Sequence, residues 1–246
     1  MSEKRILRST NRRLALKLGA AASLVAALPV RAQQPKLRFE LAMPLTGSQS
    51  AYGNDQVKAA QWAVEEINAK GGVQGRQLEM IVLDTQAEPQ VGINAVNRLV
   101  GVEKVPVFIT AWSSVVKAVA PIANREKTLM LSVGANSPDI KDLGEYVYTT
   151  FPLADVDMRA LPQWLYKTRN KRKAAVLYVN NATGVDGAKV FTQAFKDAGG
   201  EVVVNESYEE TRSDFTGLVL KVRSANPDVV HIHGVINDFK IGRAHV

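Results

Sequence analysis

Short runs of alternating or continuous hydrophobic residues recur along the chain and are separated by longer segments with helical periodicity. In the first part, such runs predict five strands, at 37–43, 78–85, 105–110, 129–133 and 146–151. Helices are expected between them, at about 55–70, from Pro89 to about residue 100, and at 114–124.

The same rhythm begins again at Asp155, after a break near Phe151-Pro152. Here the pattern predicts helices at 155–168, 186–198 and 214–225, and strands at 174–180, 201–208 and 228–234. Strands that alternate with helices are typical of parallel sheets covered on both faces. We therefore expect an α/β protein with two doubly wound parallel-sheet lobes, at 33–151 and 152–240.

The composition changes this picture only after the charge is located. With 246 residues, 46% of them hydrophobic, the chain can form substantial cores. The net charge of +7 suggests a nucleic-acid partner, but residues 1–32 contain seven Lys/Arg and one acid. Only +1 remains for the rest of the chain, so we expect no nucleic-acid partner.

The basic first segment has the features of an export signal. Arg12 and Arg13 precede an apolar run at 14–28, and small residues at Val30 and Ala32 provide a cleavage site. Such a run is too short to span a bilayer. We expect residues 1–32 to be removed near Ala32 and the mature protein to enter the periplasm without inserting into the membrane. The sequence leaves the general and the twin-arginine export routes open, and it contains no cysteine.

The last six residues, "IGRAHV" at 241–246, match the translation of a common sequencing adapter. We therefore interpret 241–246 as adapter read-through. On this reading the native chain continues past Lys240, and the second lobe at 152–240 is incomplete.

The strand ends indicate where chemistry is located, because ligands of open parallel sheets bind beyond the carboxyl ends of the strands. The first, third and fourth strands deliver "PLTGSQSAYGN", Ala111–Ser114 and Gly134–Ser137. These are small, hydroxyl and amide residues with almost no charge. A helix that begins near Ser114 adds a partial positive charge, and the combination suits a carboxylate. Taken alone, Ser113 and Ser114 are also explained by an ordinary helix N-cap.

Enzyme motifs are missing from the sequence. It has no G-x-S-x-G elbow, no P-loop and no G-x-G-x-x-G after a strand. His231 and His233 share one face of a strand, as metal ligands can, but the other histidine is His245 in the suspected adapter. A metal site would need a carboxylate such as Asp238. The alternative is two polar residues that face a cleft or solvent. We expect no catalytic residue, metal or cofactor.

The string "AVEEINAKGGVQGRQLEMIVLDTQAEP" at 63–89 resembles the type I periplasmic binding proteins of ABC transporters, most closely the leucine/isoleucine/valine-binding group. "LMLSVGANSPDI" and "DFTGLVLKVRSANPDVVHIHG" are similar to further segments of that group, so the resemblance covers about 37–239. It implies two lobes that are joined by three crossings and close on a ligand about a hinge.

The resemblance also implies the ligand-binding residues. Ser113 falls on the family's carboxylate-binding hydroxyl, and the backbone around Ser114 lies beside it. The other matching positions are Tyr52 and Trp112 beside the apolar part of the ligand, Gly134, Ala135 and Asn136 on the second ligand loop, and Thr183 where relatives often have tyrosine. Asn136 replaces a usual threonine, and Val235-Ile236 stand where some relatives carry tyrosines. The acidic residue for an α-amino group would lie beyond Lys240.

These features predict a periplasmic receptor that captures a small carboxylate-bearing solute, such as a branched-chain amino acid, and delivers it to an inner-membrane ABC permease. One alternative is a sensory receptor for an aromatic acid or amide that signals to a membrane kinase. Another is a metal-dependent periplasmic enzyme around His231 and His233.

Overall fold

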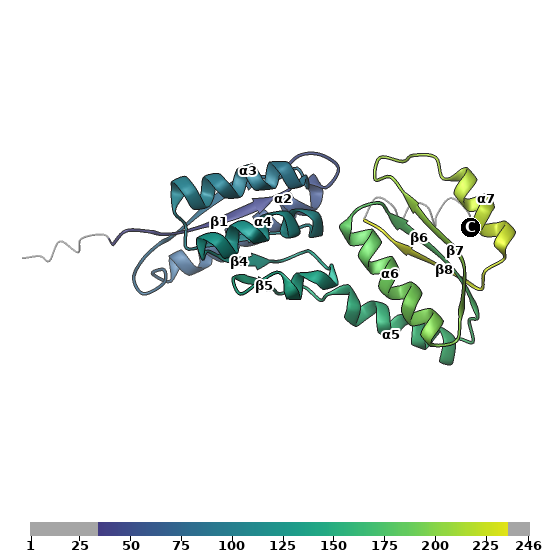
Figure 1. Cartoon of the computed structure of the whole chain (residues 1–246). Helices are drawn as coiled ribbons and strands as arrows, with labels where there is room; N and C mark the ends of the chain where they lie inside the picture. Colours follow the sequence, from purple (N-terminus) through teal and green to yellow (C-terminus); the bar gives the residue numbers. More distant parts are fainter. Residues whose placement is uncertain (1–33, 236–246) are drawn as a thin grey trace, which may run out of the picture. The chain divides into compact units, whose positions relative to one another are not determined.

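The computed structural model describes residues 34–235, which form two parallel β-sheets (Figure 1). The first sheet has the strand order β2-β1-β3-β4-β5. Its strands are β1 (Leu37–Met43), β2 (Leu78–Asp84), β3 (Val107–Thr110), β4 (Leu129–Ser132) and β5 (Val147–Thr149). We call this sheet with its helices the first lobe. All its strand pairings are parallel, as the alternation of strands and helices predicts.

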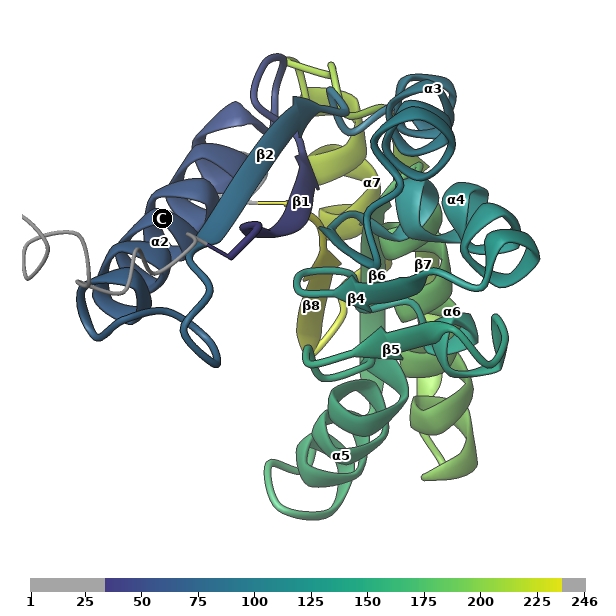
Figure 2. The same ribbon diagram turned by 90° about the vertical axis from the view of Figure 1, so that its left-hand side faces the viewer.

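Helices cover both faces of the first sheet. They are α2 (Ser50–Ala69), α3 (Pro89–Arg98), η1 (Leu99–Glu103), α4 (Ser113–Glu126) and η2 (Pro138–Asp142). Figure 2 shows α2 on one side of β1 and β2, with α3 and α4 on the other. Successive side chains of β1 divide between these faces: Leu41 and Met43 pack in the cluster with Val57 of α2, whereas Ala42 packs in the cluster of α3 and α4.

The second sheet has the strand order β7-β6-β8, and we call it with its helices the second lobe. Its elements are α5 (Ala154–Lys167), β6 (Lys173–Val179), α6 (Ala182–Asp197), β7 (Glu201–Tyr208), α7 (Thr216–Ala225) and β8 (Val229–His233). The central strand β6 is buried on both faces. Val176 packs with Phe191 of α6, and Leu177 packs with Leu218 of α7.

Several helices begin at other residues than the sequence predicts. The helix α2 begins at Ser50, not near Asp55, so Tyr52 lies on the helix and not in a loop. Its fourth residue, Gly53, lies so close to Pro44 that a Cβ would come 1.9 Å from the Pro44 carbonyl oxygen. Only a glycine fits this contact, which is why the turn-like composition concealed a helix.

The helix α6 begins at Ala182, four residues before the predicted start at Asp186. The Asn181 side chain accepts a hydrogen bond from the backbone N–H of Gly184 (3.0 Å) and caps the helix. In contrast, α7 begins two residues later than predicted, because Asp214 lies before the helix and accepts from the backbone N–H of Thr216 (2.8 Å).

The first sheet ends at Thr149 and α5 begins at Ala154, so the predicted lobe boundary near 151 lies between them. The division into two domains stays a prediction. The predicted signal segment at 1–32 and the adapter segment at 241–246 lie outside the described residues.

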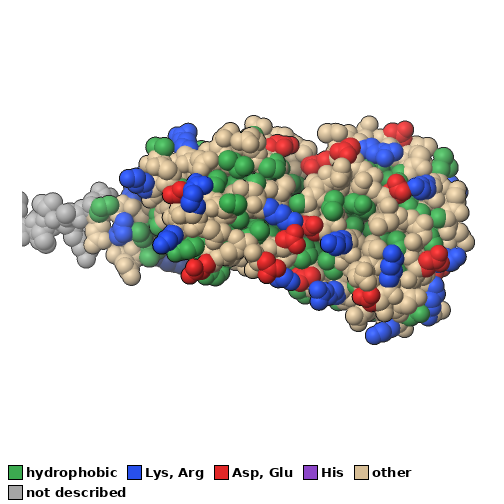
Figure 3. All heavy atoms as spheres, viewed as in Figure 1, with side chains coloured by type: hydrophobic (Ala, Val, Ile, Leu, Met, Phe, Trp, Pro, Cys, Tyr) green, Lys and Arg blue, Asp and Glu red, His purple; other side chains and the backbone are tan. Residues whose placement is uncertain are grey.

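Charged side chains of both signs are interspersed on the face shown in Figure 3, in keeping with the small net charge expected for the chain after residue 32. Within residues 34–235, none of the helices combines the length and the apolar character that a membrane crossing requires.

Candidate functional site

The junction of β3 and α4 forms the centre of the predicted ligand site. Trp112 precedes α4 with φ 78° and ψ 117°, a conformation that is unusual for a bulky residue and costs about 1–3 kcal/mol. Ser113 is fully buried, but its side chain does not cap the helix. Its Oγ accepts hydrogen bonds from the backbone N–H of Ser137 (3.2 Å) and from the Thr183 hydroxyl (3.1 Å). An ordinary N-cap therefore does not account for Ser113.

The contact between Ser113 and Thr183 joins the two lobes. Thr183 lies in the first turn of α6, 70 residues further along the chain, and it is one of the residues that the sequence predicted for the ligand site. The structure thus brings a hydroxyl from each lobe together. The neighbouring residue Ser114 lies in the first turn of α4 and is half-buried.

Two of the predicted ligand residues, both aromatic, contact each other. The rings of Tyr52 and Trp112 lie 5.8 Å apart at 67°, in an edge-to-face arrangement. Gly134 lies against the Tyr52 ring, where a Cβ would come 2.6 Å from the phenol oxygen. Burial raises the pKa of Tyr52, and a hydrogen bond with Gln56 acts in the opposite direction. These contacts bring Tyr52, Trp112 and Gly134 together.

The loop after β4 supplies the remaining predicted residues. Ala135 is fully buried in the cluster that contains Trp112 and Val235. The carbonyl oxygen of Asn136 accepts from the backbone N–H of Ala154 (2.7 Å). The side-chain oxygen Oδ1 of Asn136 is buried and has no hydrogen-bond partner among the described residues. Because an unpaired buried acceptor is costly, this oxygen is available to a ligand donor.

The predicted ligand residues omit Gln56, and they also omit Ser137, although Ser137 lies in the strand-end segment Gly134–Ser137. Gln56 lies one turn after Tyr52, and its buried Oε1 also has no partner in the described part of the chain. The i, i+4 spacing from Tyr52 would have indicated Gln56 once the helix was placed from Ser50. Ser137 also belongs to the site, since its backbone N–H reaches Ser113.

A polar cluster between the lobes adjoins these residues. Asp186 of α6 accepts from Lys117 of α4 (2.6 Å) and from the Ser137 hydroxyl (2.5 Å). Lys117 also donates to Asp139 of η2 (2.7 Å). Lys117 and Asp186 are 69 residues apart in sequence, and no local pattern relates them.

His233 is buried and does not face solvent, so that interpretation is wrong for His233, whereas His231 is half-buried. The ring of His231 stacks on Phe191 at 4.0 Å and 1°, and His233 is buried beside Gly187 beneath α6. Burial lowers the pKa of His231 to about 4, with a smaller effect from His233, and it also lowers the pKa of His233. Within residues 34–235 no three metal-ligating side chains are grouped.

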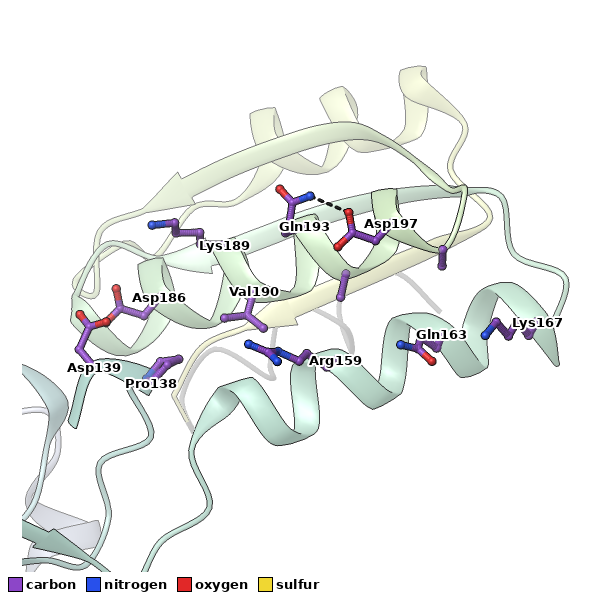
Figure 4. Close-up of a pocket in the computed structure, with 12 residues that line it drawn as sticks. Pro138, Asp139, Arg159, Gln163, Lys167, Asp186, Lys189, Val190, Gln193 and Asp197 are labelled. Carbon is purple, nitrogen blue, oxygen red and sulfur yellow. Dashed lines mark hydrogen bonds between the residues drawn. The ribbon is translucent and has the colours of Figure 1, made fainter. Parts of the chain in front are cut away.

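A cavity of about 590 Å³ lies elsewhere, between α5 and α6 (Figure 4). Charged and amide side chains make up most of its lining, among them Arg159, Gln163, Lys167, Lys189 and Gln193. None of the predicted ligand residues lines this cavity. Since Ser113 and Ala135 are fully buried, a ligand must displace the existing contacts to reach them.

Comparison with known proteins identifies the family of the chain. A family model described as periplasmic binding protein matches residues 41–239. The Leu/Ile/Val-binding protein homolog 3 of Brucella melitensis is 30% identical over 192 residues, which are 78% of this chain and 52% of that protein. The chain thus spans about half the length of the curated relatives it matches.

Solved structures show the same fold. The leucine-binding protein LivK of Thermotoga maritima is 26% identical, with a TM-score of 0.74 over 80% of this chain and 55% of that one. A solute-binding protein of an ABC transporter from Rhodopseudomonas palustris BisB5, in complex with 3,4-dihydroxybenzoic acid, has a TM-score of 0.76. It is 21% identical and covers 85% of this chain and 59% of its own, so it supports the fold alone.

The predicted fold class and family resemblance are therefore confirmed. The parallel sheets match type I periplasmic binding proteins, and the curated relatives are named as Leu/Ile/Val-binding proteins. The chain belongs to the periplasmic binding protein family.

Proposed function

We propose that the protein is the periplasmic solute receptor of an ABC transporter. It captures a small carboxylate-bearing solute, a branched-chain or related amino acid, between its lobes and delivers it to an inner-membrane permease. It performs no covalent chemistry. The proposal is supported by the relatives, which carry the leucine/isoleucine/valine-binding name, and by the pairing of Ser113 with Thr183 across the lobes.

The Ser113–Thr183 contact is the observation on which the proposal depends. Hydroxyls from two lobes meet at the N-terminus of α4, where backbone N–H groups carry a partial positive charge. Such a place suits a carboxylate oxygen, which accepts hydrogen bonds only. We expect the ligand carboxylate to enter between the two hydroxyls and to take hydrogen bonds from both.

The unpaired acceptors favour a ligand that also donates hydrogen bonds. The Oδ1 of Asn136 and the Oε1 of Gln56 are buried without partners among the described residues. A ligand with N–H groups, such as an amino acid, would satisfy them, whereas a simple carboxylate would not. Tyr52 and Trp112 would then contact its apolar part.

The test is calorimetry on the complete gene product with leucine, valine, 3,4-dihydroxybenzoate and a urea-like amide. Ser113→Ala removes a hydrogen bond to a charged group, so we expect a loss of about 2 kcal/mol, roughly thirtyfold in Kd. Ser114→Ala is the matched control, because the proposed contact uses the backbone N–H near Ser114, which the substitution keeps. If none of these compounds binds, the proposal is contradicted.

A sensory receptor for an aromatic acid is the second candidate. The edge-to-face pair of Tyr52 and Trp112 could contact the ring of an aromatic ligand. The protein also shares its fold with a solute-binding protein whose structure contains 3,4-dihydroxybenzoic acid. Uptake of a labelled ligand separates the two functions. Deletion of the gene abolishes uptake if the protein serves transport, and leaves uptake unchanged if it reports to a membrane kinase.

A further inference from the structure

Two carboxylates of the second lobe accept hydrogen bonds from side chains of the first lobe. Asp186, the fifth residue of α6, accepts from Lys117 (2.6 Å) and from the Ser137 hydroxyl (2.5 Å). Glu210, in the loop after β7, accepts from the Ser48 hydroxyl (2.9 Å) and from the Gln49 amide. The lobes are therefore held together at two places of the first lobe, one formed by α4 and the loop after β4 and the other by the loop after β1.

The Asp186 contact is partly shielded from solvent. The side chains of Asp186 and Lys117 are 20% and 27% exposed, whereas those of an ordinary surface pair, Lys70 and Glu66, are 71% and 68% exposed. Burial lowers the pKa of Lys117, but its hydrogen bonds to Asp139 and Asp186 outweigh burial and raise the pKa overall. Lys117 therefore keeps its charge, and removing one partner would leave a half-buried charge poorly compensated.

Ser137 connects this contact to the candidate ligand site. Its hydroxyl donates to Asp186, while its backbone N–H donates to Ser113. Thr183 and Asp186 lie three residues apart in α6, about one turn, which places both on the same face of the helix. The movement that brings Thr183 to Ser113 therefore also brings Asp186 to Lys117.

We propose that Asp186 and Glu210 form a clamp that holds the second lobe against the first and lengthens the residence of the ligand. In this clamp Asp186 is a positioning residue, since it contacts Lys117 and Ser137 and not the predicted ligand. The inference rests on the proposed function, because it assigns the device that keeps that site closed.

Asp186→Asn and Lys117→Ala test the clamp in the complete gene product. We expect each variant to weaken leucine binding by about tenfold, mainly through faster dissociation, as is usual for contacts that form after encounter. The double variant should lose little more than either single variant, because both substitutions remove one shared interaction. Glu206→Gln is the matched control, since its pair with Lys221 lies entirely within the second lobe.

A distance measurement separates failure of the clamp from failure of the proposed function. The chain has no cysteine, so spin labels can be placed on Cys substituted for Lys58 of α2 and Lys196 of α6. Without ligand, Asp186→Asn should increase the population with widely separated lobes, and Glu206→Gln should not. If no ligand binds, the proposed function fails, but this measurement still decides on the clamp. Identical affinities and distance distributions in Asp186→Asn and the parent protein would overturn it, as would an equal effect of Glu206→Gln.

Discussion

Glu40 is a carboxyl group in the middle of β1 that is fully buried. Neither of its oxygens has a hydrogen-bond partner among the described residues. Burial raises its pKa from 4.5 to about 7; Glu103 adds to this effect, and Arg38 and Arg98 oppose it. The folded protein therefore holds a proton on Glu40 at pH values where the unfolded chain has lost it.

This shift predicts that stability falls as the pH rises from about 4.5 to about 7. Below pH 4.5 Glu40 is protonated in both the folded and the unfolded state, and its contribution to the free energy of unfolding is fully present. Above pH 7 Glu40 is ionised in both states, and this contribution has been lost. At about 1.4 kcal/mol per pKa unit, the loss is at most about 3.5 kcal/mol. Glu40→Gln should remove this pH dependence from urea unfolding curves. The control Glu65→Gln, at an exposed position, should retain the pH dependence. If the stability of Glu40→Gln changed with pH as that of the parent protein does, Glu40 would not be its source.

At the scale of secondary-structure elements, two helical glycines have opposite roles. Gly53 of α2 lies against the Pro44 carbonyl, whereas nothing lies within 4 Å of a Cβ built on Gly217 of α7. We predict that Gly53→Ala destabilises the protein by several kcal/mol, since the backbone must move. Gly217→Ala should stabilise it by about 0.5–1 kcal/mol through helix propensity. Thermal unfolding of both variants tests these two predictions, and equal changes in stability would contradict them.

The strand and helix order could be predicted from the sequence because hydrophobic periodicity is local. The early start of α2 could not, because it depends on the contact of Gly53 with Pro44. The same contrast holds at the site. The end of β3 indicated Ser113, and the family resemblance indicated Thr183. Asp186 was expected only as the start of a helix, since its bond to Lys117 is tertiary.

At the scale of the whole molecule, large hydrophobic side chains remain exposed in the second lobe. Val156 and Trp164 of α5 are exposed, and Val230 lies on β8, an edge strand among those described. Exposed apolar groups and free strand edges favour association between chains. The matched part of the chain covers only about half of the length of its relatives, and we expect the residues corresponding to the remainder to cover these surfaces.

We therefore predict that the 246-residue chain self-associates, whereas the complete gene product is monomeric. Light scattering after size exclusion should show oligomers or aggregates of the 246-residue form, with strong binding of a hydrophobic dye. Val230→Lys should reduce this association, because a charge on an edge strand opposes pairing with a second chain. Lys58→Ala, a change on the distant surface of α2, should leave association unchanged. A monomeric 246-residue chain with cooperative unfolding would show that these surfaces need no further cover, and the second lobe would then be stable with three strands.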